Sequence, residues 1–109
     1  MDWRSEAVAL ELRARDRNEW IEHANDEFGD GHPADSYVCE CSFPGCPDLL
    51  ELTRNEYEDV RSIGSHFAIA IHHENPEIDR VVSENGRFAV VDKFLPDGRR
   101  MSLETDPRR

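Results

Sequence analysis

The sequence lacks long apolar runs, is poor in basic residues and contains little cysteine. No run of about 18 apolar residues occurs, so no membrane-spanning helix is expected. The residues from Met1 to Glu6 lack the basic start and apolar stretch of a secretion signal, which predicts a cytoplasmic protein. Acidic residues number 24 against 13 Lys and Arg, a net charge of −11. This balance disfavours general binding to nucleic acid or to anionic lipid, because both would repel the chain.

Cysteine is scarce but clustered. All three cysteines, Cys39, Cys41 and Cys46, fall within one short segment. An odd number without a secretion signal argues against a disulfide framework, which a reducing cytoplasm would not sustain. Closely spaced thiols in such a chain favour metal binding instead. Lysine is scarcer still, since Lys93 is the only one, and we interpret this bias as GC-rich coding without a mechanistic role.

Length and composition predict one α+β domain with a thin core. The chain has 109 residues, 38% hydrophobic and 34% charged. A chain this short and polar buries little apolar surface, so a covalent or metallic staple would help it to fold. We expect a long N-terminal helix, then a small antiparallel sheet and one short helix, stapled by zinc. The expected units are the N-terminal helix (1–28), a loop (29–36), the zinc-stapled module (37–94) and a flexible tail (95–109).

The first 28 residues have the pattern of an amphipathic helix. Apolar side chains recur at spacings of three and four, which places them along one side of a helix. The members of this stripe are Trp3, Ala7, Leu10, Ala14, Ile21, Ala24 and Phe28, with Arg17 at the one broken position. Such a helix is about 37 Å long, while the remaining ordered chain forms a ball about 25–30 Å across. The helix is therefore expected to overhang the module.

Two interpretations of this stripe stay open. In the first, it packs on the sheet of its own chain. In the second, the overhanging part docks a protein partner or a second copy of the chain, with Trp3 and Trp20 as anchors, because aromatic side chains dominate many interfaces.

Turn and capping signals predict the elements after the loop. The pair Pro44-Gly45 suits the middle of a type II turn. Thr53 and Glu56 match a capping box at the start of a helix, supported by a hydrophobic staple between Leu52 and Tyr57. This helix is expected to end at Gly64.

The second half of the chain is rich in strand signals. Residues 67–73 alternate with period two and predict a strand. Asn85-Gly86 lies between the apolar runs 78–84 and 87–94, which predicts a hairpin with a type I′ turn.

The cysteines and one histidine form the candidate site. Cys39 and Cys41 are two apart in an extended segment, so both thiols project from the same face. The following turn can fold Cys46 back toward them. Three soft ligands then converge as tetrahedral zinc requires, and a histidine at the end of the expected strand, His73 or His72, can supply the fourth. Three thiolates also need backbone N–H donors, which the turn from 42 to 46 can supply.

The number of ligands decides whether such a zinc ion is structural or catalytic. Four protein ligands close the shell and leave no place for an activated water, which predicts a structural metal. If no histidine binds, three cysteines leave one position open, and Glu74 or Glu40 could then act as a general base. The motifs of zinc deaminases are absent. The histidines His23, His32 and His66 are poorer ligand candidates by their positions.

A wider set of residues resembles a known family. These residues are Asn18, Glu19, Asn25 to Gly29, Tyr37 to Cys41, Pro44 to Cys46, Glu51 to Thr53, Glu56 to Glu58, Val60, Arg61, His73, Glu74, Pro76 to Ile78, Arg80 to Val82 and Phe88 to Lys93. Over residues 18–94 the pattern is similar to that of a small protein family common in actinobacteria. The family has no assigned activity, so the resemblance implies a module rather than a reaction.

The same resemblance bears on the fourth ligand. It implies His73, the histidine before the first glutamate of the His-Glu-x-Pro-Glu block. His72 stands where the family has a small residue, so a switch of ligand to His72 stays open.

Two charged groups are interpreted as solvated surface. The first consists of Arg4, Arg13, Arg15 and Arg17, interleaved with acidic residues along the helix. The second consists of Glu74, Glu77, Asp79 and Glu84, which lack the spacing of a calcium loop.

Taken together, the residues predict a non-catalytic zinc protein that acts as an interaction or scaffold module. Its expected ligands are Cys39, Cys41, Cys46 and His73. The alternative is a small zinc-dependent hydrolase or transferase with an open metal site and Glu74 as general base.

Overall fold

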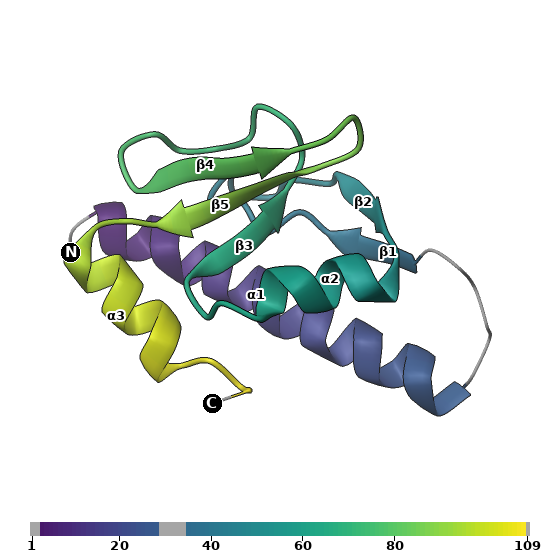
Figure 1. The fold of residues 1–109 in the computed structure, drawn as a ribbon. Helices are drawn as coiled ribbons and strands as arrows, with labels where there is room; N and C mark the ends of the chain where they lie inside the picture. Colours follow the sequence, from purple (N-terminus) through teal and green to yellow (C-terminus); the bar gives the residue numbers. More distant parts are fainter. Residues whose placement is uncertain (1–2, 29–34, 109) are drawn as a thin grey trace.

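A computed structural model describes residues 3–28 and 35–108 of the chain. Its elements confirm the α+β class and the long first helix (Figure 1). Among the described residues there are two small antiparallel sheets and two short helices, where the sequence predicts one of each. In chain order they are α1 (Trp3–Phe28), β1 (Asp35–Val38), β2 (Leu49–Leu52), α2 (Arg54–Arg61), β3 (His66–Ile69), β4 (Asp79–Glu84), β5 (Ala89–Lys93) and α3 (Pro96–Glu104). None of the described helices is long and apolar enough to cross a membrane.

The strands form two antiparallel sheets that share one core. β1 pairs with β2, and the second sheet has the order β3-β5-β4. Tyr37, Leu52, Tyr57 and Phe67 are fully buried in one cluster that joins both sheets and α2. Helix α1 runs along the other side of the molecule beneath the sheets, and α3 lies beside its first half (Figure 1).

The turn chemistry is mostly as the sequence predicts. Thr53 caps α2 with a complete capping box, in which Thr53 Oγ1 accepts from the Glu56 N–H and Glu56 Oε1 accepts from the Thr53 N–H. The hairpin of β4 and β5 has a different turn, however. No described residue near it has positive φ, as a type I′ turn requires. Asn85 Oδ1 instead accepts the N–H groups of Arg87 and Phe88, so the predicted turn type is wrong.

The buried face of α1 is more polar than the predicted stripe. Ala7 and Ala14 are buried, but Glu11, Arg15 and Asn18 are fully buried beside them. The interpretation of Arg15 as solvated is therefore wrong. Its guanidinium donates to the carbonyls of Gly64 (2.9 Å) and Ser102 (3.1 Å) and lies over the ring of Phe67, so buried partners replace the water that it loses.

Asn18 and Lys93 are also buried polar side chains whose partners in the protein replace water. Asn18 donates to the Val38 carbonyl (2.8 Å) and accepts the Val38 N–H (2.7 Å), as a neighbouring strand would. The single lysine, Lys93, is fully buried and forms ion pairs with Glu11 and Asp79. The solvated-surface interpretation of Asp79 is thus wrong, and Lys93 has a structural role.

The predicted flexible tail over 95–109 is also corrected. Residues 96–104 form α3, with Pro96 in its first turn, where proline is well tolerated. The buried guanidinium of Arg61 links Glu19 of α1 (2.6 Å) to Asp106 after α3. Arg108 pairs with Glu19, Glu22 and Glu58. These ion pairs hold the segment from 96 to 108 against α1 and α2.

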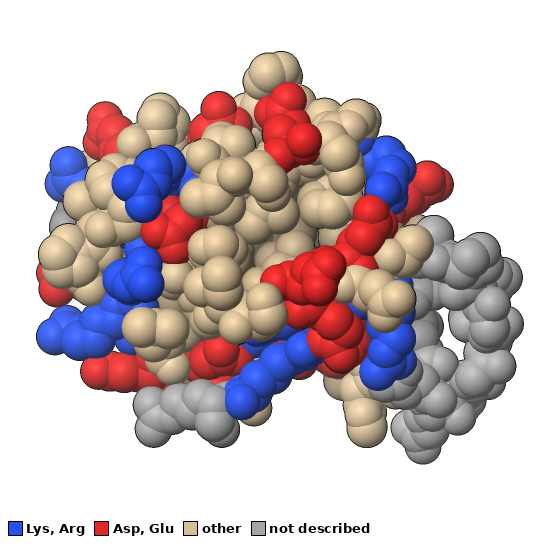
Figure 2. All heavy atoms as spheres, viewed as in Figure 1, with Lys and Arg blue, Asp and Glu red and all other residues tan. Residues whose placement is uncertain are grey.

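Charge is unevenly distributed over the surface. On the face seen in Figure 2, acidic side chains gather on the side of α2 beside several basic ones, and basic side chains also lie on the opposite side, over α3 and the start of β4. An area of uncharged side chains lies between the two sides (Figure 2).

Candidate metal centre

The segment after β1 presents two thiols on one face. It stays extended, because the Cys39 N–H donates to the Asp48 carbonyl (3.2 Å) and the Glu40 N–H donates to the Ala68 carbonyl (2.8 Å). Side chains of an extended segment alternate between faces, so the thiols of Cys39 and Cys41 share a face and Glu40 points away from them into the core. All three residues are buried.

The predicted type II turn brings the third thiol back. The Cys46 N–H donates to the Phe43 carbonyl (3.2 Å), and Gly45 at the third position of the turn has φ +71°. This is the left-handed conformation that a type II turn requires there and that glycine adopts without strain. The turn prediction is confirmed.

A second tight turn supplies the histidine. β3 ends at Ile69, earlier than the predicted strand. The His73 N–H donates to the Ala70 carbonyl (3.0 Å), and His72 has φ 72° at the third position of this turn. The turn directs His73 toward the cysteines, and His72 is exposed to solvent.

Four potential ligand atoms converge at this point. The Sγ atoms of Cys39, Cys41 and Cys46 and a ring nitrogen of His73 all lie within 4.8 Å of one another. His73 Nδ1 is 3.5 Å from Cys39 Sγ and 3.6 Å from Cys46 Sγ. A tetrahedral ion with sulfur at about 2.3 Å and nitrogen at about 2.1 Å places such atoms about 3.6 Å apart. The cluster could therefore hold a metal ion, and it includes each residue predicted for the site.

The atoms around the cluster suit ligands that carry negative charge. The Ala70 N–H donates to Cys39 Sγ (3.1 Å), and backbone groups of Phe43 and Asp48 hydrogen-bond to Cys41 and Cys46. Only one of these three donors, Phe43, comes from the turn that the sequence predicts as their source. The outer nitrogen of His73, Nε2, lies 3.3 Å from Asp48 Oδ2, an arrangement that fixes the ring of many metal-binding histidines.

Without a cation, the three thiols compete for ionisation. A hydrogen bond from Cys39 lowers the pKa of Cys41 to about 5. The same hydrogen bond, together with burial, raises the pKa of Cys39, and burial raises the pKa of Cys46. The cluster alone thus favours one thiolate and two thiols. A bound cation would be needed to stabilise three thiolates.

The two glutamates considered as general bases lie outside the cluster. Glu40 is fully buried, and its carboxylate accepts hydrogen bonds from Asn18 Nδ2 (2.8 Å), the Tyr57 hydroxyl (2.7 Å) and the Ala68 N–H (2.9 Å). It is fully engaged in the core. Glu74 follows His73 directly but is not among the residues whose ligand atoms converge.

The other histidines also lie away from the cluster. His23 is exposed on α1, and His66 contacts Asp92 (3.5 Å). His32 lies outside the described residues.

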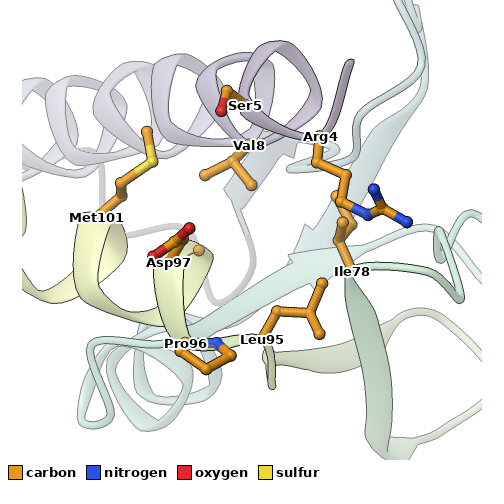
Figure 3. Close-up of a pocket in the computed structure, with 9 residues that line it drawn as sticks. Arg4, Ser5, Val8, Ile78, Leu95, Pro96, Asp97 and Met101 are labelled. Atoms are coloured by element: carbon orange, nitrogen blue, oxygen red, sulfur yellow. The ribbon is translucent and has the colours of Figure 1, made fainter. Parts of the chain in front are cut away.

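Two hollows lie along α1. One of about 230 Å³ lies between α1 and the loop that carries the thiols, and Arg17, Phe43 and all three cysteines line it. The other, of about 400 Å³, lies where the first turns of α1 and α3 meet. There Val8 and Leu95 point toward each other, while the guanidinium of Arg4 points away (Figure 3). This second hollow contains none of the candidate ligands.

Comparison of the chain with protein-family models, with curated proteins and with solved structures finds no match. The resemblance to the actinobacterial family therefore stays a prediction, and so does the role that it implies for His73. A function for this chain has to be argued from the geometry of the cluster.

Proposed function

We propose that Cys39, Cys41, Cys46 and His73 bind one zinc ion and that this ion has a structural role. The observation that carries the proposal is the spacing of His73 Nδ1 from two thiol sulfurs, 3.5 and 3.6 Å. Three thiolates and one imidazole in a tetrahedron are typical ligands of zinc. Four protein ligands close the shell, so the open, catalytic alternative with Glu74 as base has less support.

The metal would join three segments of the chain. Cys39 and Cys41 follow β1, Cys46 ends a surface turn, and His73 follows β3. Zinc would thereby tie the two small sheets together beside their shared core. Binding of a structural zinc ion contributes about 10 kcal/mol or more to small domains, which would offset the thin core of this chain.

We further propose that the zinc-stapled fold serves as an interaction or scaffold module in the cytoplasm. Reduced thiols are the state that such a site requires. The surface of α1 offers two aromatic side chains to a protein partner or to a second copy, since Trp20 is 70% and Trp3 44% exposed. Exposed tryptophans are frequent anchors of protein interfaces.

Metal content per chain tests the site directly. The protein is purified without a histidine tag, and its zinc is measured beside that of Cys46→Ser and His73→Ala. We expect one zinc per chain, lost in Cys46→Ser and bound more weakly in His73→Ala, with His72→Ala as the matched control that retains it. No zinc in the unaltered protein would refute the proposal.

Cobalt substitution tests the closed shell. A tetrahedral Co²⁺ ion bound by three thiolates gives intense visible bands, and a small competing anion such as azide alters them only where a coordination position is open. We expect bands that azide does not change. Bands that shift with azide would support the open site and overturn the structural role. Full zinc retention in His73→Ala would overturn His73 as a ligand and point to His72 or to an open position.

A further inference from the structure

A buried carboxylate on β5 gathers two arginines at the surface, away from the metal centre. Asp92 is only 5% exposed. Its Oδ1 accepts the Ser65 hydroxyl at 2.6 Å and lies 3.5 Å from His66 Nε2. Arg80, which faces Asp92 across the sheet, places Nη2 3.6 Å from Oδ2. Arg99 of α3 places Nη1 3.4 Å from Oδ1 and 3.5 Å from Oδ2.

These contacts leave most donor groups of both arginines free. Charge-assisted hydrogen bonds between guanidinium and carboxylate are usually about 2.7–2.9 Å long, so the contacts with Asp92 are long ones. The side chains of Arg80 and Arg99 are 67% and 50% exposed. Because both touch Oδ2, at 3.6 and 3.5 Å, their terminal nitrogens are close enough for one tetrahedral oxyanion to contact both.

The local charge is positive in a strongly acidic protein. Two guanidiniums share one carboxylate, and within residues 3–28 and 35–108 neither has an ion pair with another acidic group. The neighbouring Arg100 is paired with Asp97. The net charge of the whole chain is −11, and against this background two neighbouring guanidiniums that share one carboxylate form a local positive site that would attract an anion.

An apolar hollow begins beside these arginines. It has a volume of about 400 Å³, within the size range of small-molecule sites. Val60, Val82, Phe88 and Val90 supply its apolar walls, and His66, which also contacts Asp92, connects it to the arginines. Figure 2 shows this face, where an area of uncharged side chains lies between α2 on one side and α3 and the start of β4 on the other.

The far rim of the hollow has the opposite charge. Glu56 and Asp59 of α2 line it there, and Glu56 is paired with Arg87. Asp59 thus gives this rim a negative charge, which would direct the anionic end of a ligand toward the arginines and leave its apolar body over the valines.

We propose that Arg80 and Arg99 bind the phosphate of a small phosphate monoester whose apolar or aromatic body lies in the adjacent hollow. Two guanidinium groups match the several oxygens and the double charge of a phosphate monoester. Asp92 acts as the positioning residue that holds both guanidiniums in place. This site is independent of the metal centre.

Phenyl phosphate is the probe for this site, with inorganic phosphate and phenol as its two halves. Binding to the zinc-loaded protein is followed by calorimetry and by amide chemical shifts around residues 82–92. We expect phenyl phosphate to bind at least tenfold more tightly than either half. Equal binding of inorganic phosphate would overturn the role of the hollow.

Matched variants test the two arginines. Arg80→Gln and Arg99→Gln should each weaken phenyl phosphate binding about tenfold, and the double variant should abolish it. Arg13→Gln on the exposed side of α1 removes the same charge elsewhere and should leave the affinity unchanged. Unchanged affinity in the double variant, or equal loss in Arg13→Gln, would refute the site. Circular dichroism establishes that each variant is folded, which is expected because both arginines are exposed.

Discussion

A buried group on α1 and the second sheet contains Glu11, Asp79 and Lys93. The protonation of Glu11 within this group can be predicted. All three are buried, and Lys93 Nζ lies 2.5 Å from Glu11 Oε1 while it also pairs with Asp79. Burial raises the pKa of Glu11 from 4.5 to about 9 despite the attraction of Lys93. At pH 7 Glu11 is therefore a neutral carboxylic acid in the folded protein.

This state predicts how folding stability changes with pH. Between pH 4.5 and 9 the folded protein retains a proton on Glu11 that the unfolded chain has lost. Stability therefore falls as pH rises through this window and levels off above about pH 9. One proton corresponds to about 1.4 kcal/mol per pH unit, so Glu11 should cost about 2.7 kcal/mol of unfolding free energy between pH 6 and pH 8.

Two substitutions separate the neutral acid from the cation. Glu11→Gln keeps a neutral group of the same shape and should change stability by less than about 1 kcal/mol at pH 6. It should also gain about 2.7 kcal/mol relative to the unaltered protein by pH 8. Lys93→Met removes the cation that pairs with buried Asp79, which keeps its hydrogen bond from the Asn75 N–H, and should cost about 3–5 kcal/mol.

Urea denaturation at pH 6, 7 and 8 with saturating zinc is the assay, and the difference between variant and unaltered protein cancels contributions of the other groups. Glu6→Gln, which makes the same substitution at an exposed position of α1, is the control. The reasoning fails if Glu11→Gln is as damaging at pH 6 as Lys93→Met, or if its stability difference stays constant from pH 6 to 8.

Single contacts support three more predictions. His72→Gly should stabilise the protein by about 1 kcal/mol in urea denaturation, because glycine adopts φ 72° without strain. It should also leave zinc content unchanged, whereas loss of zinc would make His72 a ligand. Arg61→Met leaves Glu19 and Asp106 without their shared partner. It should cost about 3–5 kcal/mol and speed hydrogen exchange in α3, and unaltered exchange there would contradict the anchoring role. Asn18→Ala removes a donor from buried Glu40 and should cost about 1–3 kcal/mol, with weaker zinc binding in a chelator competition. Zinc affinity equal to that of the unaltered protein would separate α1 from the metal centre.

The features that sequence reasoning predicts well depend on neighbouring residues. The capping box of Thr53 and Glu56 and the type II turn at Pro44-Gly45 each lie within four consecutive residues, so their geometry is set by local backbone chemistry. The cysteine cluster is also local. Only the histidine has to be chosen over a distance. Its position beside a turn at the end of a strand narrows the choice to His72 and His73, and the resemblance implies His73.

The features that sequence reasoning misses depend on contacts between residues that are far apart in the sequence. Arg15 contacts Ser102, 87 positions away, and a hydrophobic pattern cannot distinguish a buried arginine with such partners from a solvated one. The C-terminal segment looks loose in sequence for the same reason, because α3 and Arg108 are held by residues of α1 and α2. Lys93 offers one signal, since it follows the apolar start of a strand, Ala89 to Val91, but coding bias alone also explains the scarcity of lysine.

The Asn85-Gly86 turn differs from its prediction for another reason. The dipeptide favours a type I′ turn by backbone preference, yet the Asn85 side chain accepts two backbone N–H groups of the loop. Side-chain hydrogen bonds of asparagine compete with the backbone pattern in this way, and nothing in the dipeptide itself shows which of the two prevails.

The polar core connects α1 to the metal centre through one residue. Glu40 stands between two candidate ligands, Cys39 and Cys41, and its carboxylate accepts a hydrogen bond from Asn18 of α1. The same asparagine holds both backbone groups of Val38, the residue before Cys39. The backbone that positions the first two thiols is therefore fixed from the α1 side. A protein that bound the exposed tryptophans and shifted α1 would change the geometry of the thiols and therefore their affinity for the metal. Because such coupling is reciprocal, metal loading would change the affinity of α1 for that protein by the same factor.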